Sequence, residues 1–159
     1  MRNLLLSSLL LLLVWSCKNT KQIDKTIFIY AGGLTKIRGI KEICEAIELV
    51  DENIELKLLG VWESENFKEI CLTGKTKVTY LGVTPLDKVY PILKSADVGI
   101  VTLYKEKNYL NSIPIKAFEY MACKLPILMS DIPYWENLFS ECSVDFFFQF
   151  TFSQYLNKG

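Results

Sequence analysis

The sequence has no histidine, few cysteines and no excess of either charge. The absence of histidine excludes imidazole acid–base catalysis and every zinc site that needs a histidine ligand. The five cysteines are odd in number and none falls in a C-x-x-C pair, so the pattern predicts buried reduced thiols, with neither a metal cluster nor a disulfide framework. Lys plus Arg total 18, as do Asp plus Glu, and the scattered lysines indicate no nucleic-acid partner. With 159 residues, 50% of them hydrophobic, the chain predicts one globular domain.

Residues 1–22 form an apolar N-terminal segment with two interpretations. Arg2 is followed by an apolar run from Leu4 to Trp15, which is about a dozen residues and too short to span a bilayer comfortably. The run has the charge, apolar core and small-residue exit of a secretory signal, and the residues up to Cys17 resemble a bacterial lipoprotein cleavage box. The alternative is a remnant upstream of a truncated domain.

From residue 26 to residue 146 the sequence alternates between short β-rich runs and amphipathic stretches. We expect strands at 26–31, 55–59, 77–81, 97–103, 126–129 and 143–146. We expect helices at 39–50, 64–72, 85–95 (capped by Thr84 and interrupted by Pro91), 112–123 and 133–139. This order predicts an α/β, Rossmann-like parallel sheet with helices on both faces, followed by an irregular tail at 147–159. Ligands of such sheets bind at the carboxyl ends of the strands.

The first candidate site is the turn after the first strand, AGGLTKIRG at residues 31–39. Gly32 and Gly33 let the backbone approach a ligand closely, and their amides can face a phosphate. Lys36 and Arg38 bring positive charge to the same turn, just before a helix begins. The alternative is a tight turn that carries two solvated cations.

The second candidate site is NSIPIKAFEYMACKLP at residues 111–126. Asn111 or Ser112 is expected to cap a helix, and Pro114 suits its first turn. The positive end of this helix then points out of the carboxyl edge of the sheet, with Lys116 one turn in. Glu119 shares a face with Lys116 and could accept hydrogen bonds from two ribose hydroxyls. The alternative is a simple surface ion pair.

These residues resemble the signature of group 1 (family four) glycosyltransferases of the GT-B architecture. The second site is similar to the N-S-x-P-x-K-x-x-E-Y-M-A pattern of a surface-polysaccharide branch of that family. AGGLTKIRGIKEICEAI resembles the family's first strand, phosphate turn and helix, and VTYLGVTPLDKVYPILKSADVGIVTL resembles its central strand–helix–strand unit. The likeness covers roughly residues 26–146 and implies one half of the GT-B fold, the donor-binding half.

The resemblance implies transfer of a sugar from a nucleotide-sugar donor to a glycan or lipid-linked acceptor, usually with retention and with no cofactor or bound metal. It implies that Arg38, assisted by Lys36, neutralises the donor diphosphate, that Glu119 holds the ribose, and that Gly82 and Val83 lie near the base. It implies that Asn111 to Ile113 line the sugar and phosphate site. The expected donor-binding residues are Gly32, Gly33, Lys36, Arg38, Gly82, Asn111, Ser112, Ile113, Lys116 and Glu119.

The chain departs from the family at three of these places. Asn111 stands where many members have glutamate, which weakens a claim about contacts to the sugar ring. Gly33 stands where many have arginine, which leaves Arg38 as the main phosphate cation. Lys124 replaces the usual glycine at a helix end, and a left-handed backbone there would cost about 1 kcal/mol.

The acceptor half of a GT-B enzyme is not present in this sequence, so turnover is expected to need a longer chain or a separate acceptor-binding subunit. The alternatives are a non-catalytic nucleotide-sugar-binding module, an exported or lipid-anchored protein on the same fold, and, more distantly, a nucleotide-sugar isomerase. Because nucleotide sugars are cytosolic, the donor-domain interpretation predicts a cytoplasmic location, at the inner face of the membrane; the signal-like N-terminus leaves export or lipid anchoring open. The donor-site hypothesis requires the helix start near Ser112 and the turn at Arg38 to converge.

Overall fold

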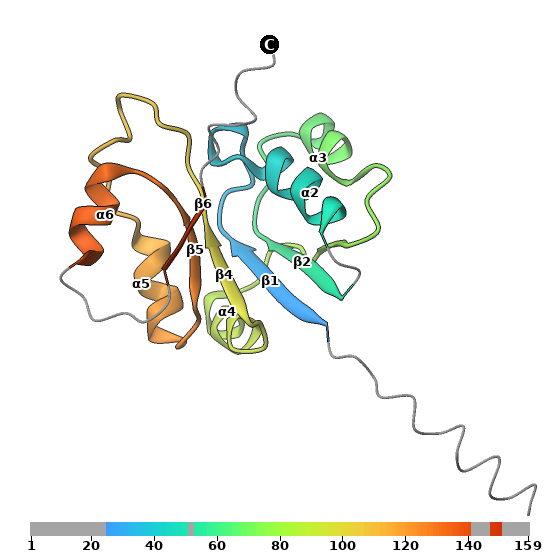
Figure 1. Cartoon of the computed structure of the whole chain (residues 1–159). Helices are drawn as coiled ribbons and strands as arrows, with labels where there is room; N and C mark the ends of the chain where they lie inside the picture. The colour runs from blue at the N-terminus through green and yellow to red at the C-terminus, as the bar shows by residue number, and fades with distance from the viewer. Residues whose placement is uncertain (1–24, 51–52, 141–146, 151–159) are drawn as a thin grey trace, which may run out of the picture.

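The computed structural model describes residues 25–50, 53–140 and 147–150, which form one parallel sheet with flanking helices (Figure 1). Neighbouring strands are parallel throughout, in the order β3-β2-β1-β4-β5-β6. The strands are β1 (Thr26–Ala31), β2 (Ile54–Leu59), β3 (Val78–Tyr80), β4 (Val98–Val101), β5 (Ile127–Ser130) and β6 (Phe147–Phe150). This order reverses direction between β1 and β4, as in doubly wound nucleotide-binding folds.

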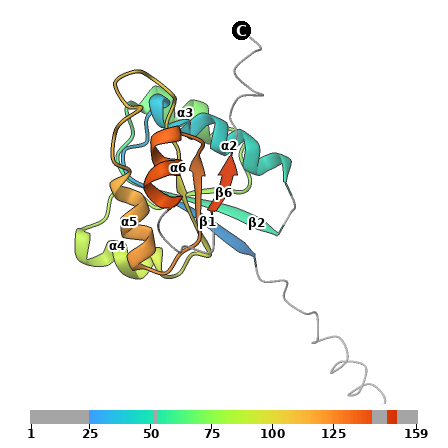
Figure 2. The same cartoon turned by 60° about the vertical axis from the view of Figure 1, so that its left-hand side comes forward.

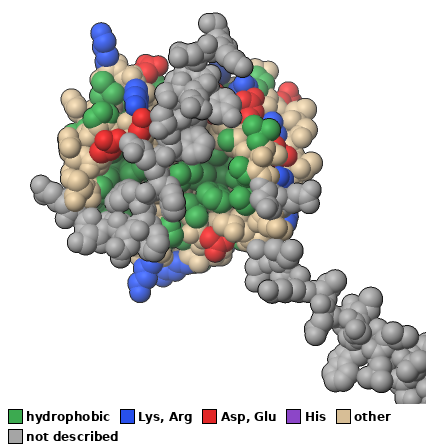
Figure 3. Space-filling model, viewed as in Figure 1, with side chains coloured by type: hydrophobic (Ala, Val, Ile, Leu, Met, Phe, Trp, Pro, Cys, Tyr) green, Lys and Arg blue, Asp and Glu red, His purple; other side chains and the backbone are tan. Residues whose placement is uncertain are grey.

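Helices cover both faces of this sheet (Figure 2). On one face α2 (Ile40–Leu49) and α3 (Glu65–Leu72) enclose a core with β1 and β2. On the other face α4 (Leu86–Leu93), α5 (Ile115–Ala122) and α6 (Pro133–Ser140) enclose a second core with β1, β4 and β5. In Figure 3, apolar side chains gather in the middle of the visible face and the charged residues lie around the rim. The predicted fold class, a Rossmann-like sheet with helices on both faces, is confirmed.

Helix α2 shows how the sequence pattern produces this layering. Ile40, Ile43 and Ile47 recur at helical spacing and are buried against β1 and β2. On the outer side, the Lys41 ammonium lies 3.0 Å from the Glu45 carboxylate one turn later. Apolar burial on one stripe and water-compatible charges on the other fix which side of α2 faces the sheet.

Helix α4 is shorter than the predicted 85–95. It spans Leu86–Leu93, and the position before it is held by Pro85 in an extended conformation, with no side-chain cap. The expected Thr84 cap with Pro85 as the first helical residue is therefore wrong by one position. Pro91 lies inside the helix and lacks an N–H, and the helix ends two residues later.

Helix α5 begins at Ile115, three residues later than predicted. Pro114 occupies the capping position, and no side chain caps the helix, so the expectation that Asn111 or Ser112 would do so is wrong. The physical reason is the proline. The ring of Pro114 disfavours helical backbone at Ile113, so the helix cannot begin before the proline. Pro114 itself, with φ −81° and ψ 77°, is not helical.

The end of α5 adopts the left-handed turn that the sequence suggested. Lys124 has φ 60°, the single non-glycine residue with positive φ among those that the structure describes. The Leu125 amide donates to the Tyr120 carbonyl at 3.0 Å and the Lys124 amide to the Met121 carbonyl at 2.9 Å. This is a Schellman motif with lysine at the position that glycine usually takes.

The C-terminal segment differs from the expected irregular tail, because Phe147–Phe150 form β6 beside β5. The segment has no helical face, but three of its four residues are phenylalanines, which favour strands. Parallel pairing with β5 then supplies backbone partners that no local pattern reveals. The strand predicted at 143–146 lies outside the described residues.

Predictions for residues 1–22, Cys17 and Cys142 also lie outside the described part of the chain. Cys44, Cys71 and Cys123 are buried free thiols, as expected. Within the described ranges, no helix has the length and apolar character needed to traverse a bilayer.

Candidate functional site

The candidate site lies at the carboxyl edge of the sheet, where β1 and β4 lie side by side and the strand order reverses. β1 ends at Ala31 and is followed by Gly32 and Gly33, while β4 ends at Val101 and is followed by Thr102. In folds of this type the chains leave adjacent strands in opposite directions at this point, which opens space for a ligand.

Three glycines at the ends of β1, β2 and β3 bring their backbones together here. The Gly32 amide donates to the Leu59 carbonyl at 2.8 Å, and the Gly60 amide donates to the Gly82 carbonyl at 2.9 Å. A β-carbon at Gly60 would collide with the carbonyl oxygen of Gly32, so no larger residue fits there without a shift. Gly82, with φ 83°, thus belongs to the same layer as the glycine turn.

The Arg38 side chain folds back towards Gly33 in the same turn. Its Nε lies 3.8 Å from the point that a β-carbon on Gly33 would occupy. The Tyr30 hydroxyl donates to the Gly33 carbonyl at 3.2 Å. Burial raises the pKa of that hydroxyl, and the charge and hydrogen bond of the Arg38 guanidinium partly oppose the rise. Tyr30, Gly33 and Arg38 therefore form one polar group.

The backbone of this turn is held by the segment that follows β4. The buried Thr102 hydroxyl donates to the Arg38 carbonyl at 2.6 Å, and the Tyr104 amide donates to the Ile37 carbonyl at 2.8 Å. Gly39, with φ 64°, then allows the chain to turn directly into α2. The backbone at Arg38 is consequently held between the segment after β4 and the start of α2.

Helix α5 delivers Lys116 to the same turn from the other side. The Cε atom of Lys116 lies 3.5 Å from the point that a β-carbon on Gly32 would occupy. The Lys116 ammonium lies 2.7 Å from a carboxylate oxygen of Glu119, and both side chains are about one-third exposed, at 34% and 28%. The first helical turn of α5 and the cationic turn after β1 thus converge, which the donor-site hypothesis requires.

Lys36 does not join this group. Its backbone amide donates to the Glu63 carboxylate at 2.9 Å, and its ammonium lies 3.9 Å from the other Glu63 oxygen. The same ammonium lies 5.8 Å from the centre of the Phe67 ring. The two cations predicted to act together therefore have different surroundings.

Asn111, Ser112 and Ile113 form the approach to α5. The Ser112 hydroxyl donates to the Tyr109 carbonyl at 2.7 Å, and the Ser112 carbonyl accepts the Trp135 indole N–H at 2.7 Å. The Ile113 side chain is 58% exposed. The Trp135 bond attaches the segment to α6, while Lys116 of α5 reaches the glycine turn and Glu119 is its ion-pair partner.

Tyr30, Gly60 and Thr102 belong to the site although no motif identifies them. Gly60 carried a usable signal, because it follows a predicted strand just as Gly32 and Gly82 do. Tyr30 and Thr102 carried none, since a tyrosine in a strand and a threonine at a strand end are ordinary β-formers.

The arrangement suits an anionic group better than a metal ion. The Arg38 and Lys116 side chains and the first turn of α5 lie beside the glycine turn, and such cationic groups favour phosphate oxygens. The expectation that both glycine amides face a phosphate is wrong for Gly32, because its amide donates to the Leu59 carbonyl. Glu119 is the carboxylate beside Lys116, and it could accept hydrogen bonds from hydroxyl groups of the same ligand.

The chain is similar to known glycosyltransferases in sequence and in fold. The sequence family described as glycosyl transferases group 1 matches residues 25–142. TuaC of Bacillus subtilis (strain 168), assigned to teichuronic acid biosynthesis as a glycosyltransferase, is 25% identical over 119 residues. These residues make up 75% of this chain and 28% of TuaC, so the chain spans less than a third of that relative.

Three solved structures have a similar fold. WaaG, a glycosyltransferase involved in lipopolysaccharide biosynthesis, superposes with a TM-score of 0.63 at 16% identity, over 87% of this chain and 36% of WaaG. HepE of Anabaena, solved in complex with UDP and glucose, gives 0.62 at 18% identity over 80% of this chain and 35% of HepE. The C-terminal domain of LpcC, a group 1 family protein of Francisella tularensis, gives 0.56 at 17% identity over 83% of this chain and 75% of that domain.

At these identities the structural likeness shows the fold alone, which is that of a single GT-B domain. The family match is independent of it and covers most of the 159 residues. This protein therefore belongs to the group 1 glycosyltransferase family, and the part described here corresponds to the C-terminal domain of its members.

Proposed function

We propose that the chain is the donor-binding domain of a glycosyltransferase that uses a nucleotide-sugar donor. The observation that carries the proposal is the convergence of Arg38 and Lys116 on the two glycines after β1, 3.8 Å and 3.5 Å from the β-carbon positions of Gly33 and Gly32. Residues from segments almost 80 positions apart in the sequence thus meet at the point where an α/β sheet of this order binds its ligand.

In this proposal the donor diphosphate lies between the two cations. The planar guanidinium of Arg38 can donate two parallel hydrogen bonds to one phosphate, and Lys116 adds a compact charge from the first turn of α5. The Gly32 and Gly33 backbone lets the diphosphate approach without side-chain obstruction. Glu119 accepts from the ribose hydroxyls, the base lies towards Gly82, and Asn111, Ser112 and Ile113 border the sugar.

Without a ligand, Lys116 and Glu119 form an ion pair. A partly exposed pair of this kind contributes little net stability, so its rearrangement around a ligand costs little. Lys116 could then turn towards a phosphate while Glu119 becomes available to the ribose.

The acceptor is proposed to be a glycan or a lipid-linked saccharide of a surface polysaccharide. The family membership and the relative assigned to teichuronic acid biosynthesis support this class. Transfer requires both reactants to be held in place, so we expect turnover only when a second α/β domain or subunit supplies the acceptor site.

Titration calorimetry of the full chain with UDP and with GDP tests the donor site. We expect saturable heat with one of the two nucleotides, and weaker binding of the matching monophosphate because it lacks the second phosphate between Arg38 and Lys116. Absence of heat with both diphosphates at millimolar concentration would contradict the proposal.

A further inference from the structure

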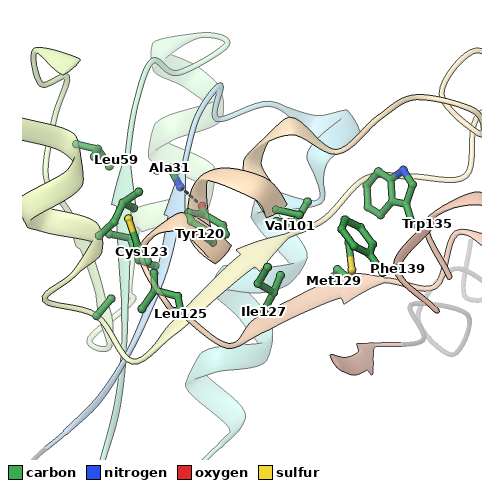
Figure 4. Packing of buried hydrophobic residues seen from close by; sticks show 14 of the residues in the cluster. Ala31, Leu59, Val101, Tyr120, Cys123, Leu125, Ile127, Met129, Trp135 and Phe139 are labelled. Carbon is green, nitrogen blue, oxygen red and sulfur yellow. Dashed lines mark hydrogen bonds between the residues drawn. The ribbon is translucent and has the colours of Figure 1, made fainter. Parts of the chain in front are cut away.

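Tyr120 connects helix α5 to the end of β1 through a buried hydrogen bond. Its side chain is fully buried in the core between α5 and the sheet, and its hydroxyl accepts the Ala31 amide N–H at 2.9 Å (Figure 4). Ala31 is the last residue of β1 and immediately precedes Gly32. The hydroxyl therefore holds the chain at the point where it enters the glycine turn.

The packing around Tyr120 leaves its ring little freedom. A β-carbon at Gly99 in β4 would collide with the Tyr120 ring, so the ring lies directly on the backbone of β4. The pairing of β1 with β4 places Gly99 opposite Ile29, two residues before Ala31. Tyr120 thus touches both strands that flank the candidate site, one by ring packing and the other by its hydroxyl.

Helix α5 connects Tyr120 to Lys116, which lies at the candidate site. Lys116 lies four residues before Tyr120, so the two side chains project from the same side of α5, one turn apart. The Tyr120 hydroxyl thus contacts Ala31, and the Lys116 Cε atom lies beside the next residue, 3.5 Å from the β-carbon position of Gly32. Loss of the first contact would free α5 to move relative to the glycines.

We propose that Tyr120 is a positioning residue that acts through Lys116, setting the distance between the first turn of α5 and the glycine turn for phosphate binding. This inference rests on the proposed function and names the device that holds its site together. The ligand that this arrangement would hold is a nucleoside diphosphate. Tyr120 itself touches no ligand, because its hydroxyl is buried behind the backbone of β1.

The test compares Tyr120→Phe with its parent by calorimetry with UDP, or with GDP where GDP is the nucleotide that binds. The substitution keeps the ring and removes the hydroxyl, and we expect on the order of tenfold weaker binding. Tyr90→Phe in α4 is the control for the same chemical change, since the Tyr90 side chain is 40% exposed and the candidate site includes no residue of α4. We expect its affinity to stay within about twofold of the parent.

A double-mutant cycle separates positioning from a general loss of structure. In a Lys116→Ala background, Tyr120→Phe should weaken binding no further, because the group through which it acts is already gone. A full additional tenfold loss in that background would overturn the inference, and so would unchanged affinity of the single Tyr120→Phe variant. A parent that binds neither diphosphate would overturn the proposed function together with the inference.

A measurement on the parent protein keeps the inference testable if Tyr120→Phe does not fold. Exchange of the Ala31 amide with solvent requires its bond to Tyr120 to open, so a nucleotide that clamps α5 to the glycine turn should slow this exchange. An Ala31 exchange rate that is the same with and without saturating nucleotide would overturn the inference.

Discussion

Helices α3 and α5 each carry a lysine–glutamate pair three residues apart, but the two pairs have different settings. In α3, Glu65 comes first and lies 3.0 Å from Lys68, whereas in α5, Lys116 comes first and lies 2.7 Å from Glu119. A carboxylate in the first turn is favourable for a helix, and a cation there is unfavourable, by about 0.3–1 kcal/mol each. The α3 pair thus supports its own helix, while Lys116 stands against the dipole of α5.

The two lysines also have different neighbours. Lys68 lies 5.6 Å from the centre of the Tyr80 ring, on the outside of the β1–β3 half of the molecule. Lys116 lies beside Gly32, where the strand order reverses. The proposed role of Lys116 in phosphate binding would account for a cation that opposes its own helix at this place.

The largest effect is expected at Arg38. Arg38→Ala removes a guanidinium that can form two charge-assisted hydrogen bonds, and we expect nucleoside diphosphate affinity to fall on the order of 100-fold. Lys36→Ala, two residues earlier in the same turn, should change it by less than about twofold, because its ammonium lies near Glu63 and Phe67. Calorimetry with the bound nucleotide measures both. Equal losses for the two variants would contradict the assignment of Arg38 as the main phosphate cation.

The next effect tests the two glutamates. Glu119→Ala should weaken nucleotide binding on the order of tenfold, because the ribose hydroxyls lose their acceptor, while the fold stays intact. Glu65→Ala removes the matched carboxylate of α3 and should leave affinity unchanged. Calorimetry combined with circular dichroism checks binding and fold together. If Glu119→Ala binds as well as the parent, Glu119 is only the surface partner of Lys116.

The sequence predicted the fold and the convergence of the two site segments better than it predicted the details of either segment. Apolar periodicity located β1 and α2 to within one residue, because each buries a regular stripe or run. The start of α5 was misplaced by three residues, because a good capping side chain at Ser112 competes with the backbone preference that Pro114 imposes, and the proline prevails.

Other features could not be predicted because they depend on distant pairing. β6 pairs with β5, and Lys36 is bonded to Glu63, which lies 27 residues further along the chain. Likewise, the bond between Tyr120 and Ala31 joins residues 89 positions apart. None of these contacts leaves a local pattern, so the family resemblance could name candidate residues but could not position them.

A smaller effect concerns the left-handed residue at the end of α5. In the other half, Gly39 takes the left-handed conformation at φ 64° directly before α2, while Lys124 takes it at φ 60° after the end of α5. Lys124→Gly should therefore raise the free energy of unfolding by about 1 kcal/mol, because glycine avoids the steric cost of its β-carbon there. Gly39→Ala should lower it by a similar amount or more. Urea denaturation measures both, and a destabilised Lys124→Gly variant would contradict the strain at this position.

The smallest effect is a pH dependence confined to the β1–β3 half. The Glu48 carboxylate accepts the Lys77 amide at 2.8 Å, the Thr76 amide at 2.8 Å and the Thr76 hydroxyl at 3.0 Å, which anchors the segment before β3 to the end of α2. The hydrogen bond from the Lys77 amide, followed by those from Thr76, holds the pKa of Glu48 below its ordinary value. The native state thus favours the ionised carboxylate.

The sign of the effect follows from that direction. Glu48 stabilises the fold fully above the ordinary glutamate pKa of about 4.3, and this contribution is lost as pH falls through the lowered native pKa. Urea midpoints of the parent should therefore fall between pH 6 and pH 3 by more than those of Glu48→Gln, which cannot ionise and is less stable at pH 6. Since the Glu48 carboxylate anchors the segment before β3 and not the glycine turn, nucleotide affinity at pH 6 should be equal in both proteins. A Glu48→Gln variant with the parent's acid sensitivity would show that carboxylates elsewhere in the chain set the acid stability of the domain.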